Sequence, residues 1–154
     1  PTYGMWGMAA WMQGEMVPEE SNHLRLSKNE KDKYGIPKLI LSVEWKENDN
    51  KMTRDFIEQQ TEMYERMGFK NIKVEDTGAP PGSDIHEMGG VRMGRDPKTS
   101  LLNEFNQLHA CKNVFVSDGA CMTSGSTQNP TLTFMTLTAR AANHAVEELN
   151  KGNL

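Results

Sequence analysis

The amino-acid sequence predicts an α+β fold, a mixed or antiparallel sheet covered by helices. Two segments in the first half alternate apolar and polar residues, as half-buried strands do. A helical repeat follows between residues 52 and 67, and a second helix is indicated near the C-terminus. The order strand, strand, helix, strand is typical of a sheet with a helix packed against it.

Composition and charge limit the classes of protein to which the chain can belong. The 154 residues suffice for one domain with a core, 36% are hydrophobic, and the formal net charge is −4. With no basic stripe and no apolar run near about 18 residues, we expect neither nucleic-acid binding nor a membrane span. Cys111 and Cys121 lack the spacing of a metal site, and they could pair or stay free. The chain starts at Pro1 without Met or a secretory leader, so we expect a piece of a longer polypeptide, and no localisation is indicated.

The N-terminal part contains the predicted strands. The first fifteen residues predict an irregular strand or two, and Asn22–Ser27 predicts a half-buried strand. Lys28–Lys33 reads as a solvated turn. The clearest strand is Lys38–Trp45, since alternate residues share one apolar face: Leu39, Leu41, Val43 and Trp45. The methionines and tryptophans near the start fit either core filling or a surface that contacts substrate or partner.

The first helix is bounded by residues that favour its two ends. Asn48, Asp49 and Asn50 are candidates for its N-cap, and Gly68 is a natural stop. Its mostly apolar face is Met52, Phe56, Gln60, Met63 and Met67. A further strand is predicted over Phe69–Val74, before the glycine- and proline-rich boundary at 78–82.

The C-terminal part combines an irregular stretch, a strand and a helix. Residues 81 to about 110 show little periodicity, which indicates either disorder or function. An apolar strand over residues 113–117 leads into Asp118 and Gly119. Asn129 is the predicted N-cap and Pro130 the first residue of the terminal helix, which ends near Lys151. Its predicted buried face is Met135, Ala139, Ala142, Val146 and Leu149.

His86 is the candidate for acid–base chemistry. Glycines at positions 89, 90 and 94 would let the backbone approach a ligand closely, and imidazole exchanges protons near neutral pH. The alternative is a loop histidine that satisfies a local hydrogen bond. His23, His109 and His144 fit structural or exposed positions better.

The helix start at Asn129 would present free N–H groups to a phosphate or an anionic ring. The strand end at Asp118 and Gly119 is a weaker signal of the same kind. The chain has no Gly-x-Gly-x-x-Gly after a strand, and therefore lacks the usual dinucleotide fingerprint.

Taken together, these motifs resemble the C-terminal part of glucose–methanol–choline (GMC) oxidoreductases, which are FAD-dependent. The pieces are His86, Gly89, Met93-Gly94, Asn113-Val-Phe-Val-Ser-Asp118-Gly119 and Asn129-Pro130-Thr131-Leu-Thr. They occur in family order between about Ser83 and Leu149, and Asn129 is most similar to the pyranose oxidase and sugar dehydrogenase branch. Glu87 and Gly90 depart from the family's usual Pro and Thr.

The resemblance implies a flavin enzyme that oxidises a sugar or another alcohol by hydride transfer to FAD. His86 would be the base, and Asn129 would hydrogen-bond the same substrate oxygen. Asp118 and Gly119 would lie along the ribityl and phosphate part of FAD, with Pro130 and Thr131 facing the ring. No metal is implied. Trp6, Trp11 and Trp45 could stack on a pyranose or belong to the core.

The resemblance also implies that the chain consists of three parts. Residues 1–80 would form substrate-domain sheet and helix, residues 81–112 an active-site loop region, and residues 113–154 a strand and helix that return to an FAD-binding domain. That domain would come from the same or a companion polypeptide, and the isolated chain would be inactive. The alternative is a non-catalytic carbohydrate-binding or assembly module.

Overall fold

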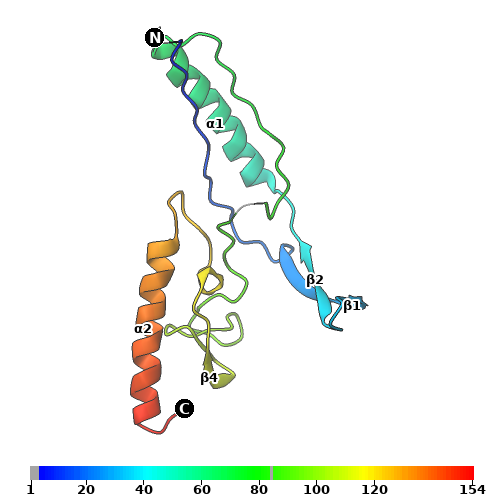
Figure 1. The fold of residues 1–154 in the computed structure, drawn as a ribbon, viewed down its shortest axis with the longest axis vertical. Helices are drawn as coiled ribbons and strands as arrows, with labels where there is room; N and C mark the ends of the chain where they lie inside the picture. The colour runs from blue at the N-terminus through cyan, green and yellow to red at the C-terminus, as the bar shows by residue number, and fades with distance from the viewer. Residues whose placement is uncertain (1–3, 84) are drawn as a thin grey trace.

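The computed structural model describes residues 4–83 and 85–154, and it contains two helices and two small antiparallel sheets. In Figure 1 the first helix lies towards one end of the molecule and the last helix towards the other. Residues 1–3 and 84 lie outside the described part, including the start of the first predicted strand region. The α+β class is confirmed, but each sheet has only two strands and the two sheets are separate.

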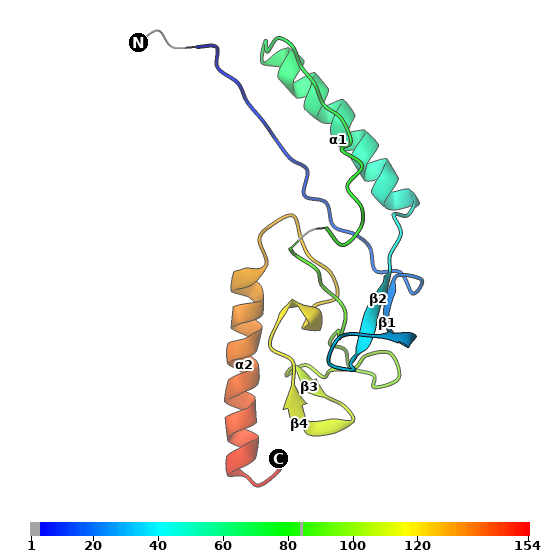
Figure 2. The same cartoon turned by 45° about the vertical axis from the view of Figure 1, so that its right-hand side comes forward.

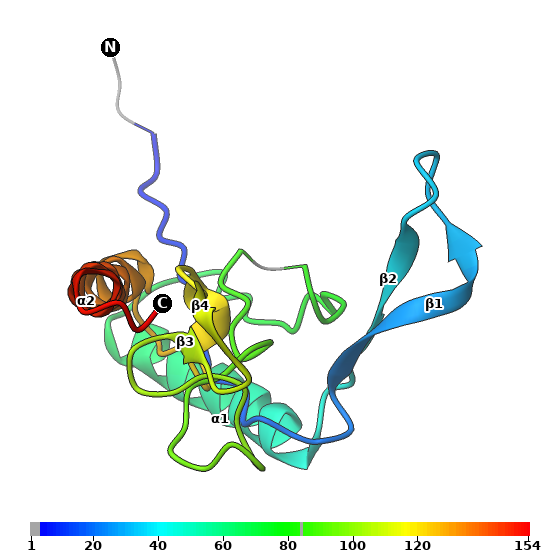
Figure 3. The ribbon, with the colours of Figure 1, turned by 90° about the horizontal axis from the view of Figure 1, so that it is seen from below.

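The first sheet is the hairpin of β1 (His23–Lys31) and β2 (Pro37–Ser42). Leu24 pairs with Leu41 and Leu26 with Leu39, so four leucines share one face. Asp32 closes the turn, because its carboxylate accepts the N–H groups of Tyr34 and Ile36. The strand therefore extends through most of the charged segment that had been predicted as a turn. Figure 3 shows the hairpin projecting away from the rest of the chain.

Helix α1 (Glu47–Arg66) follows the hairpin. It begins earlier than the Asn48–Asn50 prediction, with Lys46 as the N-cap residue. Asp49 lies in the first turn instead, where its carboxylate accepts the Lys46 N–H at 2.8 Å. The predicted stop is confirmed: Gly68 has φ +79°, a left-handed conformation that favours glycine at a helix end.

Two predicted strand regions are irregular in the structure. Residues 4–19 form no strand, and neither does Phe69–Val74, which returns along α1 as an extended segment. Alternation and apolar content cannot create a strand where no neighbouring strand supplies the hydrogen bonds. The chain that follows this segment is held by single contacts, such as the Trp45 Nε1–H donating to the Ala79 carbonyl oxygen at 3.2 Å.

The second sheet consists of β3 (Gln107–Leu108) and β4 (Cys111–Phe115), and the best-buried described residues lie in the loops before and after it. Leu102 and Asn106 are fully buried and Cys121 is 1% exposed. Asn106 has φ +60°, and its side-chain amide donates to the Val116 carbonyl oxygen. Both cysteines are free, with Cys111 exposed and Cys121 buried.

Helix α2 (Thr131–Asn150) lies against this second sheet, as Figure 2 shows. His144 stacks on the Phe105 ring at a centroid distance of 3.9 Å, and Thr138 donates to the Ser117 carbonyl oxygen. The packed side is therefore the one with Thr138, Ala141 and His144. The predicted buried face is wrong for this chain, since all its members are exposed: Met135, Ala139, Ala142, Val146 and Leu149.

The molecule exposes an unusually large surface. Its accessible area is 12213 Å², whereas a compact monomer of 17.3 kDa would expose about 7,800 Å². The only buried apolar residues among those described are Tyr64, Leu102, Cys121 and Ala141. The chain therefore leaves a large apolar area that its own residues do not cover.

Candidate active site

The segment that contains His86 is held by backbone hydrogen bonds to the segment after β4. Val91 N–H donates to the Ala120 carbonyl oxygen at 3.0 Å, and Met93 N–H donates to the Cys121 carbonyl oxygen at 2.9 Å. Residues 91–93 thus run beside η1, the short 3₁₀ turn Gly119–Cys121. The two motifs that lie about 30 residues apart in the sequence are neighbours in space.

Glycines make this approach possible. Gly89 has φ +87°, and a Cβ there would lie 2.9 Å from the Thr123 carbonyl oxygen. A Cβ on Gly119 would lie 2.6 Å from the sulfur of Met88, and one on Gly125 would lie 3.8 Å from the His86 carbonyl oxygen. At Gly89 the two backbones therefore lie closer than a side chain would allow, whereas Gly125 is in ordinary contact. The structure brings the His86 segment against the loop that leads to Asn129.

His86 and Asn129 both have side chains free to bind a ligand. His86 is half-buried and Asn129 is exposed. Neither side chain has a hydrogen-bond partner among residues 4–83 and 85–154.

The start of α2 differs by one residue from the prediction. Pro130 is the N-cap residue, with φ −86° and ψ −6°, and Thr131 is the first helical residue. Asn129 lies one residue before the cap and makes no capping hydrogen bond. Its amide therefore remains available, and the first N–H groups of α2 have no side-chain acceptor at the cap.

Asp118 has a defined local role. It is the N-cap residue of η1, and its Oδ1 accepts the Ala120 N–H at 2.9 Å. The carboxylate is exposed, so its second oxygen can accept a further hydrogen bond. Gly119 is buried against Met88 and positions the turn rather than exposing a surface.

Burial also affects the protonation state of the nearby Cys121 thiol. Burial is the largest cause that raises the pKa of Cys121, and a hydrogen bond from Asn106 opposes it. A raised pKa keeps the thiol protonated and unreactive. Cys121 therefore contributes to packing beneath the site.

Sequence reasoning missed Glu15. Its carboxylate accepts a hydrogen bond from the Ser124 hydroxyl, which joins the N-terminal segment to the loop before Asn129. A bond between residues 109 positions apart leaves no local pattern in a sequence. In the same segment Trp6 and Trp11 are 91% and 88% exposed, so of the two alternatives for these tryptophans a place in the core does not hold.

The His109 ring contacts the segment after His86 at its last glycine, Gly94. Its Nε2 lies 3.1 Å from the Gly94 carbonyl oxygen and 3.2 Å from the Ser100 hydroxyl. Since that hydroxyl donates to the Asp96 carbonyl oxygen, Nε2 must carry the proton and donate to Gly94. The prediction of a structural role for His109 is confirmed.

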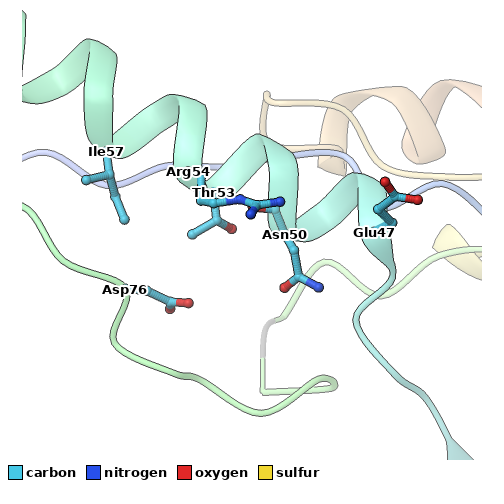
Figure 4. Close-up of a pocket in the computed structure, with 6 residues that line it drawn as sticks. All are labelled: Glu47, Asn50, Thr53, Arg54, Ile57 and Asp76. Carbon is cyan, nitrogen blue, oxygen red and sulfur yellow. The ribbon is translucent and has the colours of Figure 1, made fainter.

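A pocket beside α1 is separate from these residues. It has a volume of about 600 Å³ and lies between α1 and Asp76, as Figure 4 shows. Its lining is mostly polar: Glu47, Asn50, Thr53, Arg54, Ile57 and Asp76. A smaller pocket of about 270 Å³ adjoins the turn of Gly89 and Gly90. Neither of these two pockets is lined by His86 or Asn129.

The described residues contain no group of three or more His, Cys, Asp or Glu side chains that could hold a metal ion. Neither α1 nor α2 has the length and apolar character needed to cross a membrane.

Comparison with known proteins decides the family. The family model described as GMC oxidoreductase matches residues 18–138. The chain belongs to the GMC oxidoreductases. The matched region corresponds to the family's C-terminal domain, in agreement with the resemblance of the His86 and Asn129 motifs.

Relatives of this GMC chain include three bacterial enzymes. It is 34% identical to a 2-methyl-1,2-propanediol dehydrogenase of Mycolicibacterium austroafricanum, with 89% of this chain and 25% of the relative covered. The fructose dehydrogenase large subunit of Gluconobacter japonicus is 30% identical, with coverages of 95% and 26%. The gluconate 2-dehydrogenase flavoprotein of Pantoea cypripedii is 34% identical, with coverages of 72% and 19%. The chain thus spans about a quarter or less of these relatives.

Proposed function

We propose that this chain is the C-terminal domain of a flavin-dependent enzyme that oxidises a sugar or another alcohol. The observation that carries the proposal is the contact between the His86 segment and the Thr123–Gly125 loop before Asn129. The names of the relatives support it, because they describe dehydrogenases of a diol, a sugar and a sugar acid.

In this proposal His86 and Asn129 act on one substrate oxygen. The His86 imidazole accepts the proton of the substrate hydroxyl as that oxygen becomes a carbonyl oxygen. The Asn129 amide donates a hydrogen bond to the same oxygen and thereby orients the neighbouring C–H bond. The flavin, when bound, accepts the hydride from that C–H bond.

Several features of the chain fit an FAD molecule. The start of α2 has free N–H groups and the positive end of the helix dipole, which favour an anionic ring or phosphate. Asp118 has a free carboxylate oxygen that can accept a hydrogen bond from a ribityl hydroxyl. Gly119 is buried against Met88, so its part is to shape the turn that follows Asp118. We therefore assign Asp118, Gly119, Pro130 and Thr131 to the cofactor side of the site.

The remaining FAD contacts must come from a second portion, in the same or a companion polypeptide. The chain lacks the glycine fingerprint, and it exposes an apolar stripe along α2. The stripe includes Leu132, Met135, Val146 and Leu149, which are between 57% and 77% exposed. Such a stripe on a long helix is typical of a packing face. We assign it to the contact with the FAD-binding portion.

A charge on this stripe should disrupt the complete enzyme. Val146→Lys is expected to lower the flavin content and the melting temperature, because a desolvated ammonium without a partner costs several kcal/mol, roughly. The matched control is Glu147→Lys, at an exposed polar position about 100° around the same helix from Val146. Equal melting temperatures and flavin contents for the two variants would rule out the assigned packing face.

The proposed function is tested by comparing the isolated chain with the complete polypeptide. The complete polypeptide should show the visible absorbance of bound flavin and reduce a dye when a sugar or diol is added. The isolated 154 residues should show neither, because the remaining FAD contacts come from a second portion. Flavin binding by the isolated chain would contradict the proposal that a second portion supplies the remaining FAD contacts. A complete polypeptide without flavin or turnover would favour the non-catalytic module.

A further inference from the structure

Loop 122–130 connects η1 to Asn129 and α2, and three successive residues in it have different neighbours. The Thr123 carbonyl faces Gly89, and Gly125 lies beside the His86 carbonyl. Ser124, between them, donates its hydroxyl proton to the carboxylate of Glu15. The loop is therefore fixed on one side by the His86 segment and on the other by the N-terminal segment.

The N-terminal segment is itself anchored close to this point. A Cβ on Gly14 would lie 2.4 Å from the Met52 side chain, so residue 14 lies directly against the start of α1. Asn22 extends the hairpin by exchanging two hydrogen bonds of 3.1 Å with the backbone of Glu44. Glu15 lies between these two anchors, which gives its carboxylate a defined position.

We propose that Glu15 is a positioning residue for the reaction, acting through Ser124 on the loop that places Asn129. The inference rests on the proposed function, because it requires Asn129 to bind the reacting oxygen. A hydroxyl that donates to a carboxylate makes a stronger hydrogen bond than one that donates to a neutral acceptor. Since Asn129 itself has no hydrogen-bond partner among the described residues, its position depends on the loop before it.

The test uses the complete enzyme and follows flavin reduction in a single turnover, with a protiated and a deuterated alcohol. Glu15→Ala should slow reduction about tenfold at saturating substrate, because a small misplacement of an orienting group reduces the rate strongly. The flavin content and the deuterium isotope effect should be retained. Glu15→Gln should restore the rate to within about twofold, because its amide oxygen still accepts the Ser124 hydroxyl.

A double-mutant cycle separates positioning from a general loss of structure. Ser124→Ala should slow reduction as much as Glu15→Ala, and the double variant should lose no more than either single one. Glu20→Ala is the matched control, an exposed carboxylate of the same segment with no hydrogen-bond partner in the described residues. Additive losses, failure of Glu15→Gln to restore the rate, or a loss of flavin instead of rate would each overturn the role of Glu15.

His86→Ala, measured in parallel, distinguishes this inference from the proposed function. If His86→Ala is inactive while Glu15→Ala reduces flavin at the unmodified rate, only the inference is overturned. If His86→Ala reduces flavin at the unmodified rate, the proposed function fails and the role of Glu15 fails with it.

Discussion

Replacing His86 by alanine in the complete enzyme should lower turnover by about 100- to 10,000-fold, the range typical for loss of a general base. The flavin should remain bound, because the proposal assigns the cofactor contacts to Asp118, Gly119, Pro130 and Thr131 and none of them to the imidazole. The measurement is steady-state oxidation of the preferred alcohol, together with the absorbance spectrum of the purified variant.

His23→Ala is the matched control for this experiment. His23 lies exposed at the start of β1, where its Nδ1 contacts only the Ser21 carbonyl oxygen at 2.9 Å. Turnover within about twofold of the unmodified enzyme is expected for such an exposed position. An active His86→Ala enzyme, or an inactive His23→Ala enzyme, would remove His86 from the proposed role.

Gly89→Ala should destabilise the complete enzyme and slow its reaction. The left-handed backbone at φ +87° costs alanine about 1–2 kcal/mol. The new methyl group would also lie 2.9 Å from the Thr123 carbonyl oxygen, and relieving such a contact costs roughly 1–3 kcal/mol more. Because Thr123 belongs to the loop that leads to Asn129, the relief should displace Asn129 and lower the rate of flavin reduction.

Gly78→Ala separates the cost of the left-handed backbone from the cost of the close contact with the Thr123 carbonyl oxygen. Gly78 has φ +63°, but nothing lies within 4 Å of a Cβ at that position. This variant should therefore lose about 1–2 kcal/mol of stability and keep its activity. Thermal unfolding and turnover of both variants would check the argument. Equal stability and equal activity would show that Gly89 and the Thr123 loop are not in contact in the enzyme.

Local sequence signals predicted the elements that depend on neighbouring residues. The hairpin strands, the stop at Gly68, the strand before Asp118 and the long terminal helix all follow from periodicity and turn residues. Errors occurred where a distant partner decides the outcome. Phe69–Val74 has strand-like composition but no strand beside it, and the apolar stripe of α2 is exposed because no described residues cover it.

The candidate site likewise combines residues that the sequence could identify with contacts that it could not. The sequence supplied His86, Asn129, Asp118 and the glycines, because those residue types in that order are a family pattern. It could not reveal that Ser124 bonds to Glu15, since a contact over 109 positions has no local signature. Nor could it predict that Asn129 lies one residue before the helix cap, because the cap depends on the backbone angles of Pro130.

The sequence by itself determined the α+β class, the family resemblance and the two residues expected to act on the substrate oxygen. Only the tertiary structure decided that the His86 segment lies against the Thr123–Gly125 loop, and that Glu15 contacts the same loop. The physical reason is that periodicity and turn chemistry act over a few residues. Close packing at glycines and hydrogen bonds between loops depend instead on where the folded chain brings distant segments together.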